Sequence, residues 1–160
     1  MIGASRAREE ERRLAHEVGR LLAQAGAIVV CGGLGGVMEA CARGASAAGG
    51  LTVGILPGLE REEGNPYLSV ALPTGLGELR NGLVVRASEA LIAIGKGYGT
   101  LSEIALARRT GRSCILLESF QGILSEPPLV GPLGGELLVA STPQAAVELA
   151  LAQAAARGGG

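Results

Sequence analysis

The stretch "ALIAIGKGYGTLSEIALARRTG", residues 90–111, decides the fold. It opens with five apolar residues, continues through a turn that contains three glycines and a lysine, and ends in a helix-forming segment closed by Gly111. An uninterrupted apolar run of this length predicts a strand that is buried on both faces, and residues 100–111 predict a helix. A buried strand, a glycine turn and a helix in this order are typical of a parallel α/β sheet.

The same alternation of strands and helices extends in both directions from this stretch. Further strands are predicted at 1–5, 27–31, 51–58, 68–72, 113–117 and 136–140. Further helices are predicted at 8–26, 37–50, 78–89 and 142–156, and a Pro/Gly loop at 125–135. Residues 1–157 are therefore expected to form a single Rossmann-like domain, a doubly wound and mainly parallel sheet with helices on both faces, and residues 158–160 a frayed tail.

Two of the predicted strands differ from the buried type. Leu68, Val70 and Leu72 alternate with small or polar residues, which predicts a strand with one exposed face. The first strand, in "MIGAS", is short, so the part of the sheet around it is expected to be less well paired.

Composition limits the classes of function. The chain has 160 residues, enough for one domain, and 48% of them are apolar, but Tyr, Phe and Trp together number three. The net charge of −1 creates no long-range field that would attract nucleic acid or an anionic membrane. Three cysteines without CxxC spacing and one histidine predict neither a disulfide framework nor a metal site. No signal pattern or membrane-spanning run is found, so a soluble cytoplasmic protein is expected.

Two glycine turns are expected on one edge of the sheet. "CGGLGG" (31–36) and "GKGYGT" (95–100) each follow a buried strand, and in a parallel sheet such turns lie at the carboxyl edge. Glycine lets backbone N–H groups approach a phosphate, and the helix behind each turn adds free N–H donors and a partial positive charge. The residues predicted to hold a phosphorylated ligand are Gly32, Gly33, Gly35, Gly36, Gly95, Lys96, Gly97, Gly99 and Thr100. Neither GxGxxG nor GxxxxGK[ST] occurs, which disfavours a nicotinamide dehydrogenase and a nucleoside triphosphatase.

Several segments together resemble a known family. "GGLGGVMEA", "GILPG" and "ELRNGLVVRASEALIAIGKGYGTLSEIALA" are similar to the LOG-like family, often labelled lysine decarboxylase-like, whose signature is PGGxGTxxE preceded by an RK segment. The wording "GGVMEA" and "TGLGELRN" is most similar to the molybdenum cofactor carrier protein group of that family. The resemblance covers most of residues 2–118 and implies the Rossmann-like fold.

The resemblance also implies roles for particular residues. In the hydrolytic members, which release the free base from cytokinin riboside monophosphates, an arginine and a glutamate are essential, and these correspond to Arg80 and Glu103 here. Gly97, Gly99 and Thr100 match the phosphate loop. Several positions depart from the family pattern: Gly95 and Lys96 replace its Pro-Gly, Asn81 replaces its lysine, and Glu89 its aspartate.

Each candidate also has a purely structural interpretation. "TLSE" (100–103) is spaced as a capping box, with Thr100 as N-cap and Glu103 three residues later. Arg80 could be a solvated charge or the partner of Glu78 or Glu103, and Lys96 could project into solvent. Ser5 could line the pocket or cap the helix that follows it.

Two functions from different classes follow. The first is a binding protein that carries a phosphorylated nucleotide or a molybdopterin-type cofactor without converting it and needs no other cofactor. The second is a nucleoside 5′-monophosphate phosphoribohydrolase that uses Arg80 and Glu103. Lysine decarboxylation is not expected, because nothing in the sequence resembles a pyridoxal-phosphate lysine site. The apolar terminal helix suggests a homodimer or a homotetramer.

Overall fold

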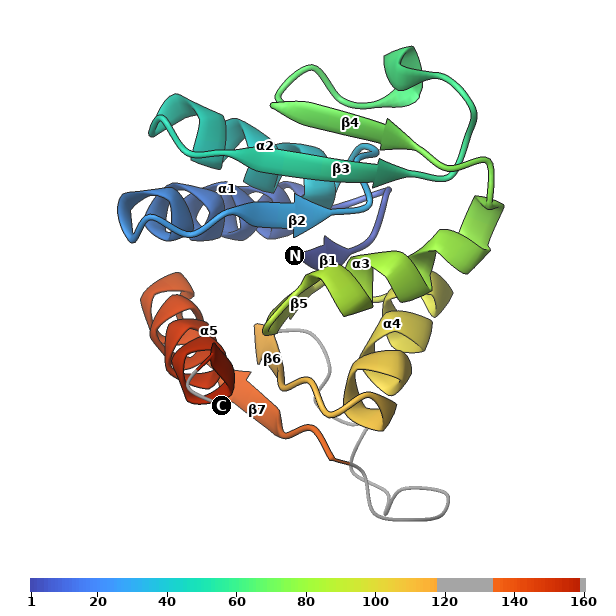
Figure 1. The fold of residues 1–160 in the computed structure, drawn as a ribbon. Coiled ribbons are helices and arrows are strands. Elements are labelled where there is room, and N and C mark those ends of the chain that lie inside the picture. Colours follow the sequence, from blue (N-terminus) through green and yellow to red (C-terminus); the bar gives the residue numbers. More distant parts are fainter. Residues whose placement is uncertain (118–133, 159–160) are drawn as a thin grey trace.

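The computed structural model describes residues 1–117 and 134–158, and every strand pair within these residues is parallel (Figure 1). One ladder has the order β1 (Ile2–Gly3), β5 (Leu91–Ile94), β6 (Cys114–Leu117) and β7 (Leu137–Ala140). The other has the order β2 (Val29–Cys31), β3 (Thr52–Leu56) and β4 (Val70–Pro73). The ladders lie side by side, with β1 next to β2, so that the strands follow one another as in a single doubly wound sheet (Figure 1).

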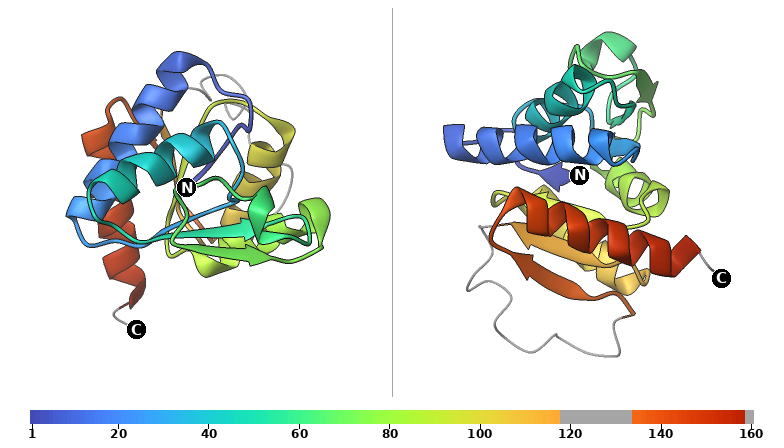
Figure 2. Two further views of the ribbon diagram at one scale, coloured as in Figure 1. Left: turned by 90° about the horizontal axis from the view of Figure 1, so that it is seen from above. Right: turned by 90° about the vertical axis from the view of Figure 1, so that its left-hand side faces the viewer.

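Helices cover both faces of this sheet, as the sequence predicted (Figure 2). One hydrophobic cluster lies under α1 (Glu9–Gln24), α2 (Val37–Ala47) and α5 (Pro143–Gly158). The opposite cluster lies under α3 (Asn81–Ala87) and α4 (Tyr98–Arg109). Two short 3-10 helices, η1 (Arg61–Glu63) and η2 (Gly77–Arg80), complete the described elements. Most of the Pro/Gly loop predicted at 125–135, and residues 159–160 of the predicted tail, lie outside the described residues.

The central strand β5 explains why its sequence is apolar without alternation. Ile92 and Ile94 face the cluster under α1, α2 and α5, whereas Leu91 and Ala93 face the cluster under α3 and α4. All four side chains are buried. A strand covered on both faces has no polar positions, and this is the pattern the sequence presents.

The strand predicted at residues 68–72 has one exposed face, as expected, but its apolar side chains Val70 and Leu72 lie on that face. β4 spans Val70–Pro73, and Val70 and Leu72 are 46% and 44% exposed. β4 is the outermost strand of its ladder, and the connection that precedes it contains the three-residue η1 instead of a full helix. Val70 and Leu72 therefore do not enter the core, whereas Leu68, which precedes the strand, packs against it.

The two ladders meet at a short strand. β1 has two residues and pairs with β5 over Ile2 and Gly3, and the α-ammonium of Met1 donates a hydrogen bond of 2.7 Å to the carbonyl of Val30 in β2. The weak pairing expected around "MIGAS" is confirmed, because the pairing of β1 with β2 does not extend into a ladder.

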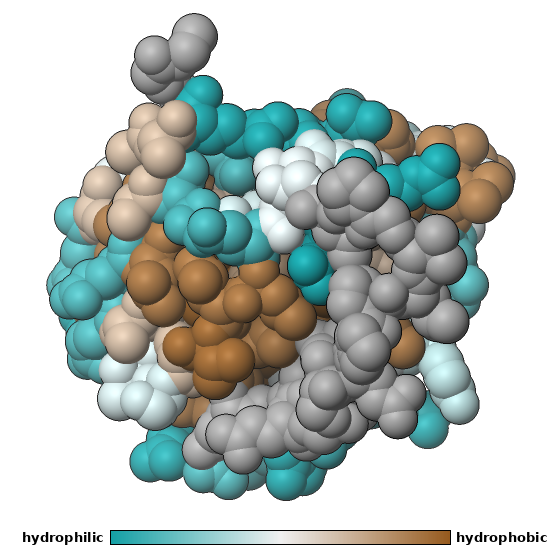
Figure 3. Space-filling view, turned by 90° about the horizontal axis from the view of Figure 1, so that it is seen from below, coloured by the Kyte–Doolittle hydropathy of each residue, from teal (hydrophilic) through white to brown (hydrophobic). Residues whose placement is uncertain are grey.

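Exposed apolar residues gather away from this junction. The face seen from below in Figure 1 carries a patch of apolar residues (Figure 3), and β7 forms the sheet edge on that side, with Val139 63% exposed. The terminal helix α5, in contrast, buries Ala146, Val147 and Ala150 within its own chain. Within the described residues, no helix has both the length and the apolar character that crossing a membrane requires.

The pair of helices α1 and α2 is fixed by close backbone contact. A Cβ placed on Gly19 of α1 would lie 2.0 Å from the carbonyl oxygen of Cys41, and one placed on Gly44 of α2 would lie 1.9 Å from that of His16. Both distances are shorter than any real carbon–oxygen contact, so each glycine allows the opposite backbone to approach. This packing holds the β1–α1 and β2–α2 turns next to each other.

Replacement of Gly44 by alanine should therefore destabilise the protein. Overpacking costs about 1–3 kcal/mol, which exceeds the gain of up to about 1 kcal/mol from the higher helix propensity of alanine. We expect a lower free energy of unfolding for Gly44→Ala in urea titrations.

Gly82→Ala is the matched control, because Gly82 lies in α3 and a Cβ placed there meets no atom within 4 Å. This variant should be as stable as the unmodified protein or more stable by up to about 1 kcal/mol. Equal stability of the two variants would contradict the close approach of α1 and α2.

Candidate functional site

A cleft of about 560 Å³ opens at the carboxyl ends of strands from both ladders. The turn after β1, the start of α2, the end of β3, η2, the start of α3 and the first turns of α4 all contribute to it. Its lining residues are Gly3, Ala4, Ser5, Arg6, Leu34, Met38, Pro57, Gly77, Glu78, Arg80, Asn81, Lys96, Gly97, Tyr98, Gly99, Thr100 and Glu103. Carboxyl edges of this kind are where open parallel sheets bind ligands.

Arg80 and Glu103, predicted from separate segments of the sequence, meet in this cleft. Arg80 ends η2, and Glu103 lies in the second turn of α4. Their side chains are 9% and 7% exposed, and Nη1 of Arg80 lies 3.7 Å from Oε1 of Glu103. Of the interpretations left open by the sequence, the structure shows the ion pair with Glu103 and excludes a solvated Arg80.

The Arg80 guanidinium lies against the backbone of Gly32. A Cβ on Gly32 would lie 2.5 Å from Nη2 and 2.8 Å from Cζ of Arg80, so any side chain at this position would displace the guanidinium. The Nε atom of Arg80 is buried without a hydrogen-bond partner among the described residues. Arg80 is thus a buried cation whose donors the protein satisfies only in part.

Asn81 connects Arg80 to the first turn of α4. Nη1 of Arg80 donates to Oδ1 of Asn81 at 2.5 Å, and Nδ2 of Asn81 donates to Oγ of Ser102 at 3.3 Å. Ser102 in turn donates to the carbonyl of Gly99 at 2.8 Å. These hydrogen bonds orient Arg80 relative to the N-terminal end of α4.

The first turn of α4 presents free donors to the cleft. The helix begins at Tyr98 with Gly97 as N-cap, and Gly97 has no side chain that could cap it. The N–H groups of Tyr98, Gly99 and Thr100 have no acceptor within the helix, and the helix dipole adds a partial positive charge. Such a helix end is suited to bind an anion.

This helix start corrects the capping-box interpretation of "TLSE". Because α4 begins at Tyr98, two residues before Thr100, Thr100 is inside the helix and is not its N-cap. Thr100 and Glu103 are both buried at 2% and 6% exposure. The spacing that resembled a cap places both side chains on the cleft side of α4.

The glycines of the first loop pack against protein and do not line the cleft. Gly36 has φ +67°, and a Cβ on it would lie 2.3 Å from the carbonyl oxygen of Ala4. The N–H of Gly33 donates to Sγ of Cys31 at 3.3 Å, and its carbonyl accepts from Asn65. Gly35 lies near the Ser5 carbonyl and the Glu39 carboxylate. Ligand contact by Gly32, Gly33, Gly35 and Gly36 remains a prediction. In the structure these glycines pack against residues that lie beneath the cleft or line it, such as Arg80 and Ala4.

The second loop divides into a buried start and an exposed rim. Gly95 is buried with φ +77°, and a Cβ on it would meet the carboxylate of Glu11 at 3.3 Å. Lys96, Gly97 and Gly99 are exposed and line the cleft. The loop thus brings the exposed cation Lys96 and the backbone donors of α4 to the same opening.

Several cleft residues were not predicted from the sequence. Leu34, Met38 and Pro57 form an apolar part of the wall, and Tyr98 stands at the rim with 95% of its surface exposed. The sequence signal for Tyr98 was its position between two glycines of the turn. A tight turn has no interior that could bury an aromatic ring, so the ring must lie on the surface. Ser5 lines the cleft and does not cap α1, which begins at Glu9.

Burial changes the acidity of Glu103. Burial away from water raises the pKa of the Glu103 carboxyl group from 4.5 to about 7, although the positive charge of Arg80 acts in the opposite direction. The same burial lowers the pKa of Arg80, which nevertheless stays charged at neutral pH. Glu103 is therefore protonated in part of the molecules near pH 7, and it can both donate and accept a proton there.

The raised pKa predicts how stability depends on pH. The folded protein binds more protons than the unfolded chain between pH 4.5 and about 7, so stability is lost as pH rises through this interval. Glu103→Gln removes this effect. The free energy of unfolding of the variant minus that of the unmodified protein should therefore be roughly 3 kcal/mol higher above pH 7 than at pH 4. Urea titrations of both proteins across this range measure the difference.

Glu89→Gln serves as control for this measurement, because Glu89 is exposed. Urea titrations of this variant give the background for the comparison. A Glu103→Gln difference that varies with pH no more than the Glu89→Gln difference would show that the Glu103 carboxyl is not perturbed by burial.

Comparisons with known proteins identify relatives of this chain. A protein of unassigned function from Archaeoglobus fulgidus is 46% identical over 112 residues, 70% of this chain and 74% of the relative. The molybdenum cofactor binding protein of Rippkaea orientalis is similar in structure with a TM-score of 0.82 and 34% identity, over 94% of this chain and 93% of that protein. The molybdenum cofactor carrier protein of Chlamydomonas reinhardtii has a TM-score of 0.78 and 29% identity, over 97% of both chains.

The family model described as LDcluster4, the SLOG cluster4 family, matches residues 1–147. The resemblance drawn from "GGVMEA", "TGLGELRN" and "GKGYGTLSE" is thereby confirmed, for the LOG-like superfamily and for the similarity to molybdenum cofactor carrier proteins. The chain belongs to the SLOG cluster4 family.

Proposed function

We propose that this protein binds a phosphorylated ligand of the molybdopterin or nucleotide type in the cleft and carries it without converting it. The phosphate would be held by the first turn of α4 and by Arg80, and the heterocycle would lie along the apolar wall formed by Leu34, Met38 and Pro57. The solved relatives named above bind or carry the molybdenum cofactor, and their similarity over nearly the whole chain supports this class of ligand.

The observation that carries the proposal is the partly unsatisfied Arg80 beside the α4 end. Arg80 is 7% exposed, lines the cleft and has a buried Nε without a partner among the described residues. A buried cation is costly unless it is paired, and Glu103 at 3.7 Å pairs with it only loosely. An anionic ligand in the cleft would neutralise this charge, because the guanidinium fork fits phosphate oxygens at two points.

The cleft fits the chemistry of such a ligand at both ends. Backbone donors and Arg80 suit the phosphate, and Lys96 adds a charge at the rim. The exposed ring of Tyr98 offers a flat surface near the opening on which a planar heterocycle could stack. The molybdenum atom would be cargo held by the pterin, and no residue of the chain is assigned to it here.

Hydrolysis of nucleoside 5′-monophosphates is the second candidate function, and the state of Glu103 favours it. A carboxyl group with a pKa of about 7 in a cleft can serve as general acid or base, and here it lies beside an arginine that can hold a phosphate. The carboxylate form could also stabilise the positive charge that develops at the sugar as its bond to the base breaks.

A homodimer or homotetramer and a cytoplasmic location remain predictions of the sequence. The structure offers an alternative surface to the terminal helix for contact between copies. Leu76, Leu79 and Leu83, spaced at three and four residues along η2 and α3, are 46%, 82% and 43% exposed beside a groove that reaches Leu106. This face lies on the opposite side of the same segment that brings Arg80 to the cleft.

Arg80→Lys tests the binding function directly. The lysine keeps the charge but loses the two-point contact, so we expect the affinity for a molybdopterin-type ligand or a simple pterin phosphate to fall about 10- to 100-fold in isothermal titration calorimetry.

Arg86→Lys is the matched control, because Arg86 lies in α3, the helix that Arg80 precedes as N-cap, but outside the cleft lining. It should bind as the unmodified protein does. Equal affinities of all three proteins would remove Arg80 from the site, and absence of binding to any pterin phosphate would overturn the proposed carrier function.

Turnover distinguishes the two functions. The protein is incubated with a panel of nucleoside 5′-monophosphates, and release of free base is followed by chromatography. The carrier function predicts no release by any variant. Release that falls by about 100-fold or more in Glu103→Gln, with nucleotide binding retained, would instead establish the hydrolase.

A further inference from the structure

A groove of about 370 Å³ lies at the surface between η2, α3 and α4, next to the segment that brings Arg80 to the cleft. The two helices α3 and α4 pack side by side there (Figure 1). The groove is apolar where it begins at η2 and basic where both helices end. We call this surface the α3 face, and its lining residues are Leu76, Leu79, Gly82, Leu83, Val85, Arg86, Leu106, Arg109 and Thr110.

Three leucines of the α3 face expose large apolar side chains to water. Leu79 is 82% exposed, and Leu76 and Leu83 are nearly half exposed. Their spacing of three and four residues places them on one side of the η2–α3 segment, where they form a leucine strip. A contiguous apolar strip bordered by charged residues is typical of a surface that another protein covers.

Charged side chains at both ends of the α3 face lack partners. Arg86 and Arg109 are exposed and form no salt bridge with any described residue. Glu78 lies in the first turn of η2 beside Leu79, and it is likewise exposed and without a salt bridge among the described residues. The face is therefore acidic at one end of the leucine strip and basic at the other.

The position of Glu78 is unfavourable for the proposed ligand. Its side chain lines the cleft two residues before Arg80, where the proposed function requires a phosphate. Two negative charges repel each other, so an unpaired carboxylate at this place weakens the binding of an anion. A cation brought close to Glu78 removes this repulsion. This step rests on the proposed function, whereas the leucine strip and the unpaired arginines do not.

A second copy of the chain carries both the apolar surface and the cation that the α3 face lacks. In a two-fold symmetric contact the same surface meets itself in the reversed direction. The acidic end of one copy then faces the basic end of the other, and the two leucine strips cover each other. Each contact between opposite charges occurs twice, once on each side of the symmetry axis.

We propose that two copies of the chain associate through their α3 faces about a two-fold axis, and that Arg109 of the partner subunit pairs with Glu78 at the rim of the cleft. Burial of the leucine strips stabilises the dimer through the hydrophobic effect. The paired charges fix the relative direction of the two subunits. Because Glu78 belongs to both the interface and the cleft lining, each subunit neutralises a charge in the cleft of the other.

Charge reversal tests this pairing without any ligand. Sedimentation velocity measures the dissociation constant of the dimer for the unmodified protein, for Glu78→Arg, for Arg109→Glu and for the variant with both changes. Each single change places like charges against each other at two positions of the dimer, so its dissociation constant should rise about tenfold or more. The double variant restores opposite charges and should return to within about threefold of the unmodified protein.

Arg43→Glu is the matched control, because it makes the same change of charge at an exposed position of α2, away from the α3 face. It should dimerise as the unmodified protein does. The proposal is overturned if the unmodified protein stays monomeric at high concentration or if the single variants dimerise normally. It is also overturned if the double variant dimerises no better than the single ones.

Calorimetry with a simple pterin phosphate separates this inference from the proposed function. Arg109→Glu leaves Glu78 unpaired, so the affinity should fall about threefold or more, whereas Arg43→Glu should not change it. Full affinity of a dissociated Arg109→Glu variant would overturn the role of the partner subunit at the cleft. Absence of binding by the unmodified protein would contradict the carrier function instead, and the sedimentation result would still decide the interface.

Discussion

The site depends on one buried pair of opposite charges, Arg80 and Glu103, held where α4 begins. Taking two such groups out of water costs several kcal/mol for each, and at 3.7 Å their attraction returns only part of that cost. The rest of the local structure acts to keep them there: Gly32 leaves space for the guanidinium, and Asn81 orients it. The protein thus maintains a cation with spare donors beside a carboxyl group that is easily protonated, and this is the state that an anionic ligand would stabilise.

The two glycine loops serve this pair in different ways. The second loop ends in the N-terminal turn of α4, so its glycines bring backbone donors to the cleft. The first loop lies beneath, where Gly36 admits the backbone of the β1–α1 turn and Gly33 packs on Leu56. The close contact of α1 with α2 fixes this arrangement, because it determines how near the turns after β1 and β2 can come. Glycine here is required as much for backbone packing as for contact with a ligand.

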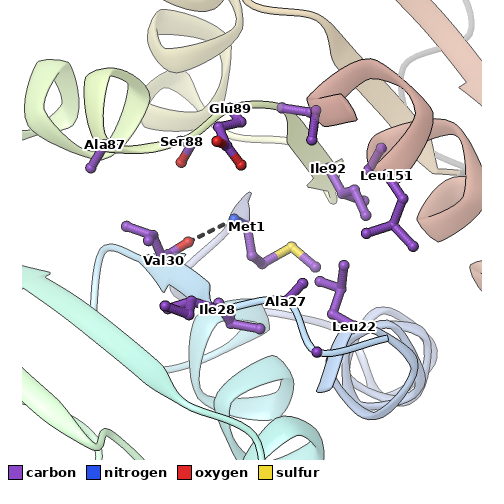
Figure 4. A pocket seen from close by; sticks show the side chains of 15 residues that line it. Met1, Leu22, Ala27, Ile28, Val30, Ala87, Ser88, Glu89, Ile92 and Leu151 are labelled. Carbon is purple, nitrogen blue, oxygen red and sulfur yellow. Dashed lines mark hydrogen bonds between the residues drawn. The ribbon is translucent and has the colours of Figure 1, made fainter. Parts of the chain in front are cut away.

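The junction between the ladders shows that the sheet is not equally strong along its length. At the carboxyl half of the sheet centre, β1 fills the space between β2 and β5 below the cleft, whereas a cavity of about 460 Å³ lies at the amino half (Figure 4). The Met1 ammonium, which donates a hydrogen bond to the Val30 carbonyl, lies between the two regions.

The sequence by itself determined the architecture, because unbroken apolar strands such as Leu91–Ile94 and glycine-ended helices require a parallel sheet covered on both faces. It also identified Arg80 and Glu103 as candidate site residues, through the resemblance of the motifs "TGLGELRN" and "GKGYGTLSE" to those of the LOG-like family. Only the tertiary structure decided that Thr100 is inside the helix, that Val70 and Leu72 stay outside the core, and that Gly32 supports Arg80. These outcomes depend on where a helix starts, which strand lies at an edge and what approaches a backbone from a distant segment. Local patterns carry no information on such contacts, because they arise between residues far apart in the chain.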